Sequence, residues 1–385
     1  MNIFGTNFDY QGRIDNIRQV MSKENLDCII VHNWTNQYYL GGHYQHMPWY
    51  PVSHTHITES PLIVFKDHDP VFLAAFITMN AVREGTWIKD VRVIDQEHAP
   101  SAHEGIARVL KEKGLEAGNI GIEEKCCTAS TYLNLVKVLP NAKIKPAGDI
   151  LYLSRVVKDS AEIDLIKQAV AIAESAIEVA KKTAQPGVTE MEVQLAMEIE
   201  MKRLGAFREV ETMCQSGIRT ANYRAFAADW KKIGNDEIVT VDLGCLYKGY
   251  GCDITRTWIV GTPTAEQKKI AADLCAVFDM ACEYIKPGMV FGDVFDHFRG
   301  VLVDMGYPAR KTAFPCQQFT IHGIGLGPFH DYPHPTHRET VFEPGMPISF
   351  QSAVRHSDYT IRIEDNLLIT EDGVEILSNG PRNLI

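Results

Sequence analysis

The sequence lacks long hydrophobic segments and clusters of basic residues. No stretch approaches the roughly 20 consecutive apolar residues that a membrane-spanning helix needs. The formal charge of −11, with no block of lysine or arginine, gives the protein no electrostatic attraction to phosphate backbones or anionic lipids. We therefore expect neither a membrane nor a nucleic-acid partner.

Cysteine pairs with metal-binding or redox spacing are also absent. The nine cysteines are scattered without a CxxC motif, and an odd number in a chain of 385 residues fits reduced thiols better than a disulfide framework. The start of the chain, MNIFGTNFDYQGRID, lacks the basic residues and the apolar run of a secretory signal. These features predict a cytoplasmic protein.

The first part of the chain alternates helical patterns with short apolar runs. Residues 10–26 are amphipathic and precede the apolar run 27–33, and two further strands are predicted at 61–65 and 70–76. A helix over 103–118 separates two more β-branched runs, VRVID and IGIEE. This alternation predicts an α/β domain.

The pattern changes close to residue 155. Asp159 and Glu162 have the spacing of a helix capping box, and they precede the long helical pattern of residues 163–184. We therefore predict two domains, residues 1–155 and residues 156–385.

The second domain contains a weak internal repeat. The segments AQPGVTEMEV and IKPGMVFGDV start at residues 184 and 285, and each follows a helical pattern, turns at Pro-Gly and opens another helix. A spacing of this length indicates a duplicated α+β half with pseudo-twofold symmetry, because solenoid repeats are much shorter. The alternative is that Pro-Gly after a helix is common punctuation.

Three acids lie inside apolar strands of this domain. Residues 237–261 are expected to form two strands of a hairpin that carry Asp242 and Asp253, and Glu364 lies in a strand rich in isoleucine and leucine. A carboxylate in such a place is costly unless its charge is compensated. The partner is either a divalent cation or a basic side chain such as Arg256.

Histidines gather in residues 319–339. His322 precedes a glycine-rich bend, and three more histidines, including His330 and His334, follow it. Neutral imidazole is a good ligand for zinc, iron, cobalt or manganese, and carboxylate oxygens complete a mixed site.

The motifs VDLG, DITRT, HGIG and RIED, in this order, resemble the pita-bread metallohydrolases: prolidase, aminopeptidase P, methionine aminopeptidase and creatinase. The resemblance extends to RVVKDSAEIDLIKQA and NWTNQYYLGG, and so to essentially the whole chain. It implies an α/β N-terminal domain followed by an α+β pita-bread catalytic domain. It also implies one or two divalent ions (Mn, Zn, Fe or Co) on Asp242, Asp253, His322, Gln351 and Glu364.

The chain departs from the peptidase pattern at three places. SFQSA stands where the peptidases have a glutamate, so Gln351 offers a neutral amide, and one metal ion or none becomes an alternative. The segment QSGIRTANYRAF lacks a histidine that the peptidases have, and Arg224 lies near its position. His330 follows His322 by eight residues rather than seven, and it stays the candidate for the second active-site histidine, with His334 next.

The resemblance implies a metal-dependent hydrolase that cleaves a C–N bond in a small amide or an Xaa-Pro dipeptide. His330 would stabilise the developing oxyanion or bind substrate, Arg362 would orient Glu364 or a substrate carboxylate, and Arg224 would bind substrate. Three alternatives remain: a metal-free amidinohydrolase like creatinase, a lyase like that acting on dimethylsulfoniopropionate, and an inactive binding protein. QSGI and the C-terminal ILSNGPRNLI favour the first, and DITRTW with HGIGL favours the second.

Members of this superfamily often cover the active site with the N-terminal domain of a neighbouring subunit. Residues 43–59 are rich in histidine and aromatic residues, so we expect a homodimer in which His43 and Trp49 contact substrate. The alternative is an ordinary surface loop.

Overall fold

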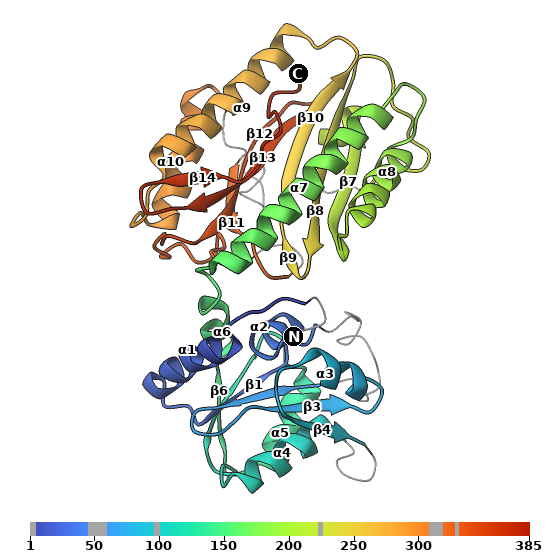
Figure 1. Cartoon of the computed structure of the whole chain (residues 1–385). Coiled ribbons are helices and arrows are strands. Elements are labelled where there is room, and N and C mark those ends of the chain that lie inside the picture. The colour runs from blue at the N-terminus through green and yellow to red at the C-terminus, as the bar shows by residue number, and fades with distance from the viewer. Residues whose placement is uncertain (1–4, 45–59, 96–100, 222–225, 308–318, 328–330) are drawn as a thin grey trace. The chain divides into compact units, whose positions relative to one another are not determined.

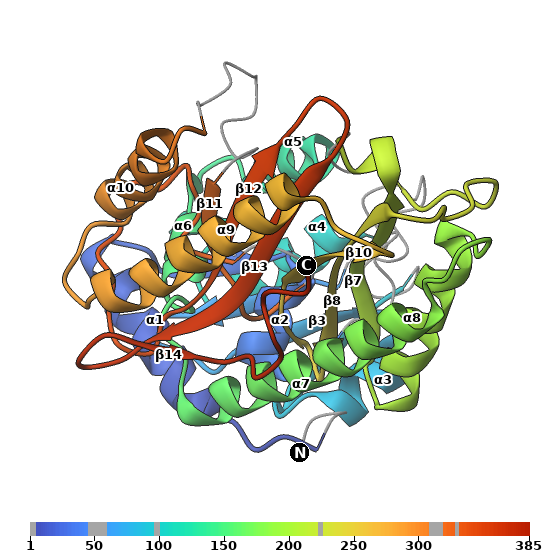
Figure 2. The same ribbon diagram turned by 90° about the horizontal axis from the view of Figure 1, so that it is seen from above.

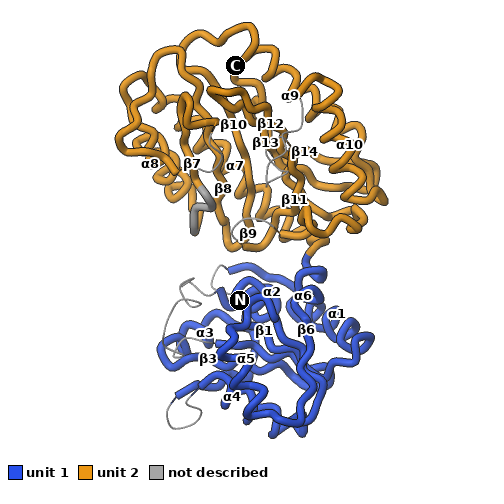
Figure 3. Tube along the Cα trace, turned by 180° about the vertical axis from the view of Figure 1, so that it is seen from behind, with its two compact units in different colours: residues 1–155 blue, residues 156–385 orange. Residues whose placement is uncertain are grey.

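The computed structural model describes residues 5–44, 60–95, 101–221, 226–307, 319–327 and 331–385. The chain forms two compact units, Met1–Arg155 and Val156–Ile385, which Figure 3 shows in different colours. None of the described helices is long and apolar enough to cross a membrane.

Unit 1 is built on a six-stranded mixed sheet with the strand order β4-β3-β2-β1-β5-β6. Strand β1 pairs antiparallel with β2 and parallel with β5, and all its residues are buried, as expected for a strand covered on both faces. The strands are β1 Cys28–Val31, β2 Leu62–Phe65, β3 Val71–Ala75, β4 Asp90–Ile94, β5 Asn119–Ile122 and β6 Lys143–Pro146. The helices are α1 Tyr10–Lys23, α2 Trp34–Gly41, α3 Met79–Gly85, α4 Ala102–Glu112, α5 Ala129–Val138 and α6 Gly148–Leu153.

Unit 2 contains an eight-stranded sheet whose main path is β11-β12-β13-β10-β8-β7. Neighbouring strands along this path are antiparallel. The strands are β7 Arg208–Ser216, β8 Glu237–Tyr247, β9 Tyr250–Gly251, β10 Ile254–Val260, β11 Phe319–Gly323, β12 Pro347–Arg355, β13 Thr360–Ile369 and β14 Val374–Ile376. The helices are α7 Ser160–Thr183, α8 Glu190–Arg203, the short 3-10 helix η3 Gly217–Ala221, α9 Ala265–Tyr284 and α10 Phe291–Asp304.

Unit 2 consists of two similar halves. Each half runs through two helices and then three strands of the sheet path, and the halves meet where β10 pairs with β13. The turns between the paired helices place Gly187 and Gly288 at φ of 94° and 86°, a backbone conformation that favours glycine. Helix α7 begins at the predicted capping box of Asp159 and Glu162. The predicted pseudo-twofold α+β fold is confirmed.

The two faces of the unit 2 sheet differ in chemistry because successive side chains of a strand point to opposite faces. One face packs on helices: Phe350 of β12 makes ring contacts with Phe278 of α9 and Phe298 of α10, and α7 and α9 lie along the sheet in Figures 1 and 2. The other face carries a row of polar residues, which we call the polar face. Its members are Asp242, Thr255, Thr320, His322, Ser349, Gln351, Arg362 and Glu364.

Candidate metal centre

Cross-strand pairing brings the predicted acids of β8, β10 and β13 together. Thr255 is paired with Asp242 on one side and with Glu364 on the other. Its hydroxyl oxygen lies 2.9 Å from Asp242 Oδ1 and 2.9 Å from Glu364 Oε2. A threonine hydroxyl has one proton, so it donates to only one of these two oxygens at a time. Asp253 directly precedes β10 and reaches the same place.

His322 completes a group of metal-binding side chains with Asp253 and Glu364. Its Nε2 atom lies 3.6 Å from Asp253 Oδ2 and 3.5 Å from Glu364 Oε1. One donor atom from each of the three residues lies within 4.8 Å of the others, and the described residues hold no other such group of three histidine, cysteine or acidic side chains.

The backbone fixes which nitrogen of His322 faces the two acids. Nδ1 lies 3.1 Å from the carbonyl oxygen of Gly323, which only accepts hydrogen bonds, so Nδ1 carries a proton. In the neutral ring the lone pair is then on Nε2, and it points at the acids. A peptide carbonyl in this position is a common orienting partner of metal-binding histidine. The three side chains therefore fit a divalent transition metal.

The groups around Glu364 favour its ionised form. Burial alone would raise the pKa of Glu364, but the neighbouring His322, Ser349 and Arg362 outweigh burial and hold that pKa below its ordinary value. Ser349 donates a hydrogen bond of 2.7 Å to Glu364 Oε1. An ionised carboxylate is the form that binds a metal ion.

Asp242 forms an ion pair with Arg362 and not with Arg256, although Arg256 is closer to it in the sequence. Arg362 Nη1 lies 2.8 Å from Asp242 Oδ2, within the polar face. Burial nevertheless dominates and raises the pKa of Asp242, against the opposing charge of Arg362. Arg256 points to the opposite face, where its guanidinium binds Asp365 at 2.9 Å. The alternative in which Arg256 compensates the acids of the hairpin is therefore wrong.

The other predicted site residues fall into two groups. Among the described residues, His334 is half-buried, and burial followed by the charge of nearby His322 lowers its pKa. His43 lies in the core of unit 1, where its ring meets Phe72 edge-on and burial lowers its pKa to about 4. His330, Arg224 and Trp49 lie outside the described residues, so their predicted roles stay predictions.

A buried ion pair that the sequence did not reveal holds the chain next to His334. Lys158 Nζ lies 3.2 Å from Asp331 Oδ2, with side chains 1% and 3% exposed. The Asp331 amide donates to the carbonyl of Gly323 at 2.8 Å, which ties the segment to β11. A Cβ at Gly325 would lie 2.6 Å from Lys158 Cε, so glycine leaves room for the lysine. The only sequence signal was a lysine in the RVVKDS motif.

Glu190 is a second residue that sequence reasoning missed. Its buried carboxylate accepts hydrogen bonds from the backbone and side chain of Ser216, from Arg219 and from the Ala228 amide. These partners lie on both sides of the segment that contains Arg224. Glu190 therefore anchors both ends of that segment to the first turn of α8.

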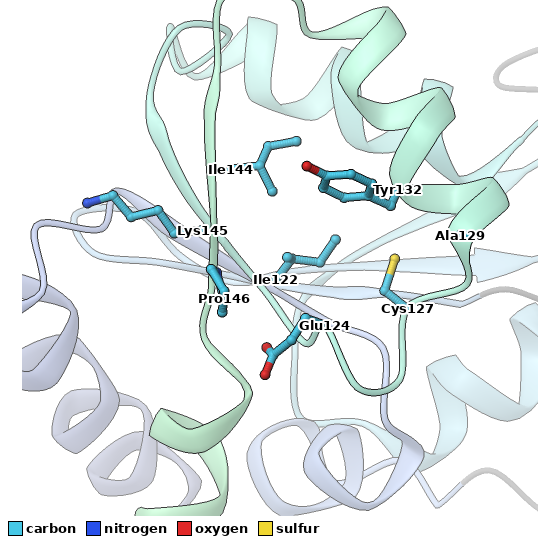
Figure 4. Close-up of a pocket in the computed structure, with 8 residues that line it drawn as sticks. All are labelled: Ile122, Glu124, Cys127, Ala129, Tyr132, Ile144, Lys145 and Pro146. Atoms are coloured by element: carbon cyan, nitrogen blue, oxygen red, sulfur yellow. The ribbon is translucent and has the colours of Figure 1, made fainter.

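Unit 1 has a pocket of its own, of about 420 Å³, at strands β5 and β6 and helix α5. In Figure 4, Tyr132 lies near Ile122 and Ile144, and Lys145 points away from them. The pocket contains no residue of the polar face, and its lining is mainly apolar.

Comparisons with known proteins agree with this geometry. The family model described as metallopeptidase family M24 matches residues 164–371, and the model of the Creatinase/Prolidase N-terminal domain matches residues 13–157. An Xaa-Pro dipeptidase of Pyrococcus horikoshii is 27% identical over 97% of this chain and 98% of that protein. An Xaa-Pro dipeptidase of Pyrococcus furiosus is 32% identical over 63% of this chain and 69% of that protein.

Solved structures give the same result. The Xaa-Pro dipeptidase of Bacillus anthracis aligns with a TM-score of 0.85 at 26% identity, covering 98% of this chain and 99% of that one. The prolidase of Pyrococcus horikoshii aligns with a TM-score of 0.82 at 26% identity, covering 97% and 100%. These matches confirm the predicted superfamily, the pita-bread fold and a metal-dependent hydrolase of the Xaa-Pro dipeptidase and creatinase type. The chain belongs to metallopeptidase family M24.

Proposed function

We propose that this protein hydrolyses the C–N bond of a small amide of the Xaa-Pro dipeptide class, with one divalent ion held by Asp253, His322 and Glu364. The observation that carries the proposal is the convergence of these three donors, with Nε2 of His322 aimed at both acids. Xaa-Pro dipeptidases are also among the relatives that match nearly all of the chain.

The bound ion would activate water and polarise the amide carbonyl. Manganese, zinc, iron and cobalt all suit a set of one imidazole and two carboxylates. Arg362 keeps Asp242 in place through its 2.8 Å ion pair. Because its pKa is lowered, His334 is neutral near pH 7 and can accept a proton or donate a hydrogen bond at the site.

We propose that His330 and Arg224 contact substrate, and that Trp49 acts from the N-terminal domain of a second subunit. The ring of His43 is buried against Phe72 in the core of unit 1 and is left out of this proposal. The two domains would be residues 1–155 and 156–385, in agreement with the compact units. A cytoplasmic homodimer fits the free thiols of the described cysteines, and light scattering of the purified protein tests the dimer.

The decisive variant is Asp253→Ala. We expect wild-type protein saturated with Mn²⁺ to hold about one ion per chain, and Asp253→Ala to lose at least about 100-fold in kcat/KM together with the ion. Asp304→Ala, an exposed acid at the end of α10, is the matched control and keeps both. Metal analysis and a panel of Xaa-Pro dipeptides, creatine and dimethylsulfoniopropionate provide the readout.

Full activity of the wild type after exhaustive chelation would rule the proposal out. Turnover of creatine without metal would instead establish the amidinohydrolase alternative. That alternative gains its support from Gln351, which stands where the peptidases have a metal-binding glutamate.

A further inference from the structure

Gln351 occupies the centre of the polar face. It lies in β12 directly opposite Glu364 of β13 and Thr320 of β11, so its side chain shares a face with the metal-binding acid. The residue is 2% exposed. The amide of Gln351 therefore lies on the same face as Glu364 and is shielded from bulk water.

Arg362 determines how the amide is oriented. Arg362 Nη1 lies 3.4 Å from Gln351 Oε1, and a guanidinium group only donates hydrogen bonds. Turning the amide over would bring two donors face to face, so the oxygen must face Arg362. The amide nitrogen then points away from the arginine.

In this orientation Gln351 Nε2 is buried and has no hydrogen-bond partner among the residues that the structure describes. A buried donor that has lost water and gained no acceptor is destabilising, and a catalytic role is one of the reasons for which native proteins retain such a group. The nitrogen of an amide has no lone pair available for a metal ion, because that pair is delocalised into the carbonyl. Any partner of Nε2 must therefore be an acceptor atom.

We propose that Gln351 is a catalytic hydrogen-bond donor rather than a metal ligand, and that Nε2 donates to the carbonyl oxygen of the amide bond being cleaved. This inference rests on the proposed function and assigns a role to one residue within it. Negative charge develops on that oxygen as the carbonyl is attacked, so a preorganised donor stabilises the transition state more than the bound substrate. Because Gln351 does not bind the metal ion in this proposal, the three ligands remain Asp253, His322 and Glu364.

The test compares Gln351→Met, which has a similar shape and no donor, with Ser352→Ala. Ser352 is the matched control because it follows Gln351 in β12, is equally buried and has an unpartnered hydroxyl, but faces the helices beside Phe319. We measure the Kd of Mn²⁺ by calorimetry, kcat and KM for the best Xaa-Pro dipeptide, and the Tm of the metal-free proteins.

For Gln351→Met we expect a Kd for Mn²⁺ within about threefold of wild type, because no ligand is lost, and a kcat lowered at least about tenfold with KM changed less than threefold. The metal-free Tm should stay close to that of wild type, because removal of the unsatisfied donor offsets loss of the 3.4 Å contact between Oε1 and Arg362, which keeps its ion pair with Asp242. Ser352→Ala should leave kcat, KM and Kd within about twofold of wild type.

A larger loss of Mn²⁺ affinity in Gln351→Met would show that Gln351 is a ligand and overturn the inference alone. So would a kcat within tenfold of wild type, or a lower metal-free Tm, which would indicate a structural role. Wild-type protein that binds no Mn²⁺ would overturn the proposed function and this inference together.

Discussion

A single buried carboxyl in unit 1 shows how one residue can make stability depend on pH. Glu123 is 1% exposed and accepts hydrogen bonds from the backbone amides of His32 and Asn33 and from the Asn36 side chain. Burial is the largest influence, and it raises the pKa of Glu123 to about 7 in spite of these bonds. The proton that the folded protein retains links folding to pH.

We expect Glu123 to favour folding below pH 4.5 and to lose that contribution as the pH rises to 7, because the unfolded chain releases its proton first. The loss is about 3 kcal/mol for a difference of this size. In Glu123→Gln, Asn36 can turn its unpartnered Oδ1 toward the new amide, so that variant should lack this part of the pH dependence.

Hydrogen exchange of β1 amides in a urea series at pH 5 and pH 8, corrected for intrinsic exchange rates, measures this difference. Wild type and Glu123→Gln both retain His32, whose pKa is lowered by burial, so its titration cancels in the comparison. Parallel pH curves for the two proteins would contradict the assignment.

At the scale of elements, the polar face depends on connections between segments far apart in the chain. Lys158, just before α7, holds Asp331, just after the loop that follows β11. Glu190 at the start of α8 holds Ser216 at the end of β7 and Ala228, which lie on either side of Arg224 in the sequence. Both segments carry predicted substrate-binding or catalytic residues, so we expect these buried charges to act by positioning the segments.

Removing one partner of the Lys158–Asp331 pair should be strongly destabilising. Lys158→Met leaves a buried carboxylate without its cation, which costs about 3–5 kcal/mol, whereas Lys158→Met with Asp331→Asn should recover a large part of that loss. Urea unfolding of the single and double variants measures the coupling. Additive effects of the two changes would show that the ion pair does not act as a unit.

At the scale of the whole molecule, the chain is two compact units, and the metal-binding residues belong to the second one. A ligand that binds only the folded state stabilises the unit that contains its site. Metal should therefore separate the thermal behaviour of the two units.

Mn²⁺ at a hundredfold excess over its Kd should stabilise unit 2 by about 2.7 kcal/mol, which corresponds to a rise in Tm of about 5–10 °C for a unit of this size. The transition of unit 1 should not move. Calorimetry with Mn²⁺ and with a chelator checks this, and Asp253→Ala should show no shift. An equal rise in both transitions would mean that the units unfold together.

Much of the site was predictable because its residues lie in strands with a clear pattern. The acids Asp242 and Glu364 interrupt apolar strands, and the histidine-rich segment follows a glycine bend, so a metal-binding constellation could be predicted. The basic residue that pairs with Asp242 could not be predicted. Arg256 and Arg362 are both near acids along the chain, and only the strand register shows that Arg256 lies on the opposite face.

The sequence by itself determined the order of elements, the family and the residue types at the metal centre, because helix caps, strand alternation and short motifs are local properties. The tertiary structure decided three things: the pairing of Arg362 with Asp242, the ion pair of Lys158 with Asp331, and the direction of the Gln351 amide. Each depends on side chains from different strands or loops meeting in a buried place. There the cost of an unpaired charge, or of two hydrogen-bond donors facing each other, selects one arrangement, and no local pattern carries that information.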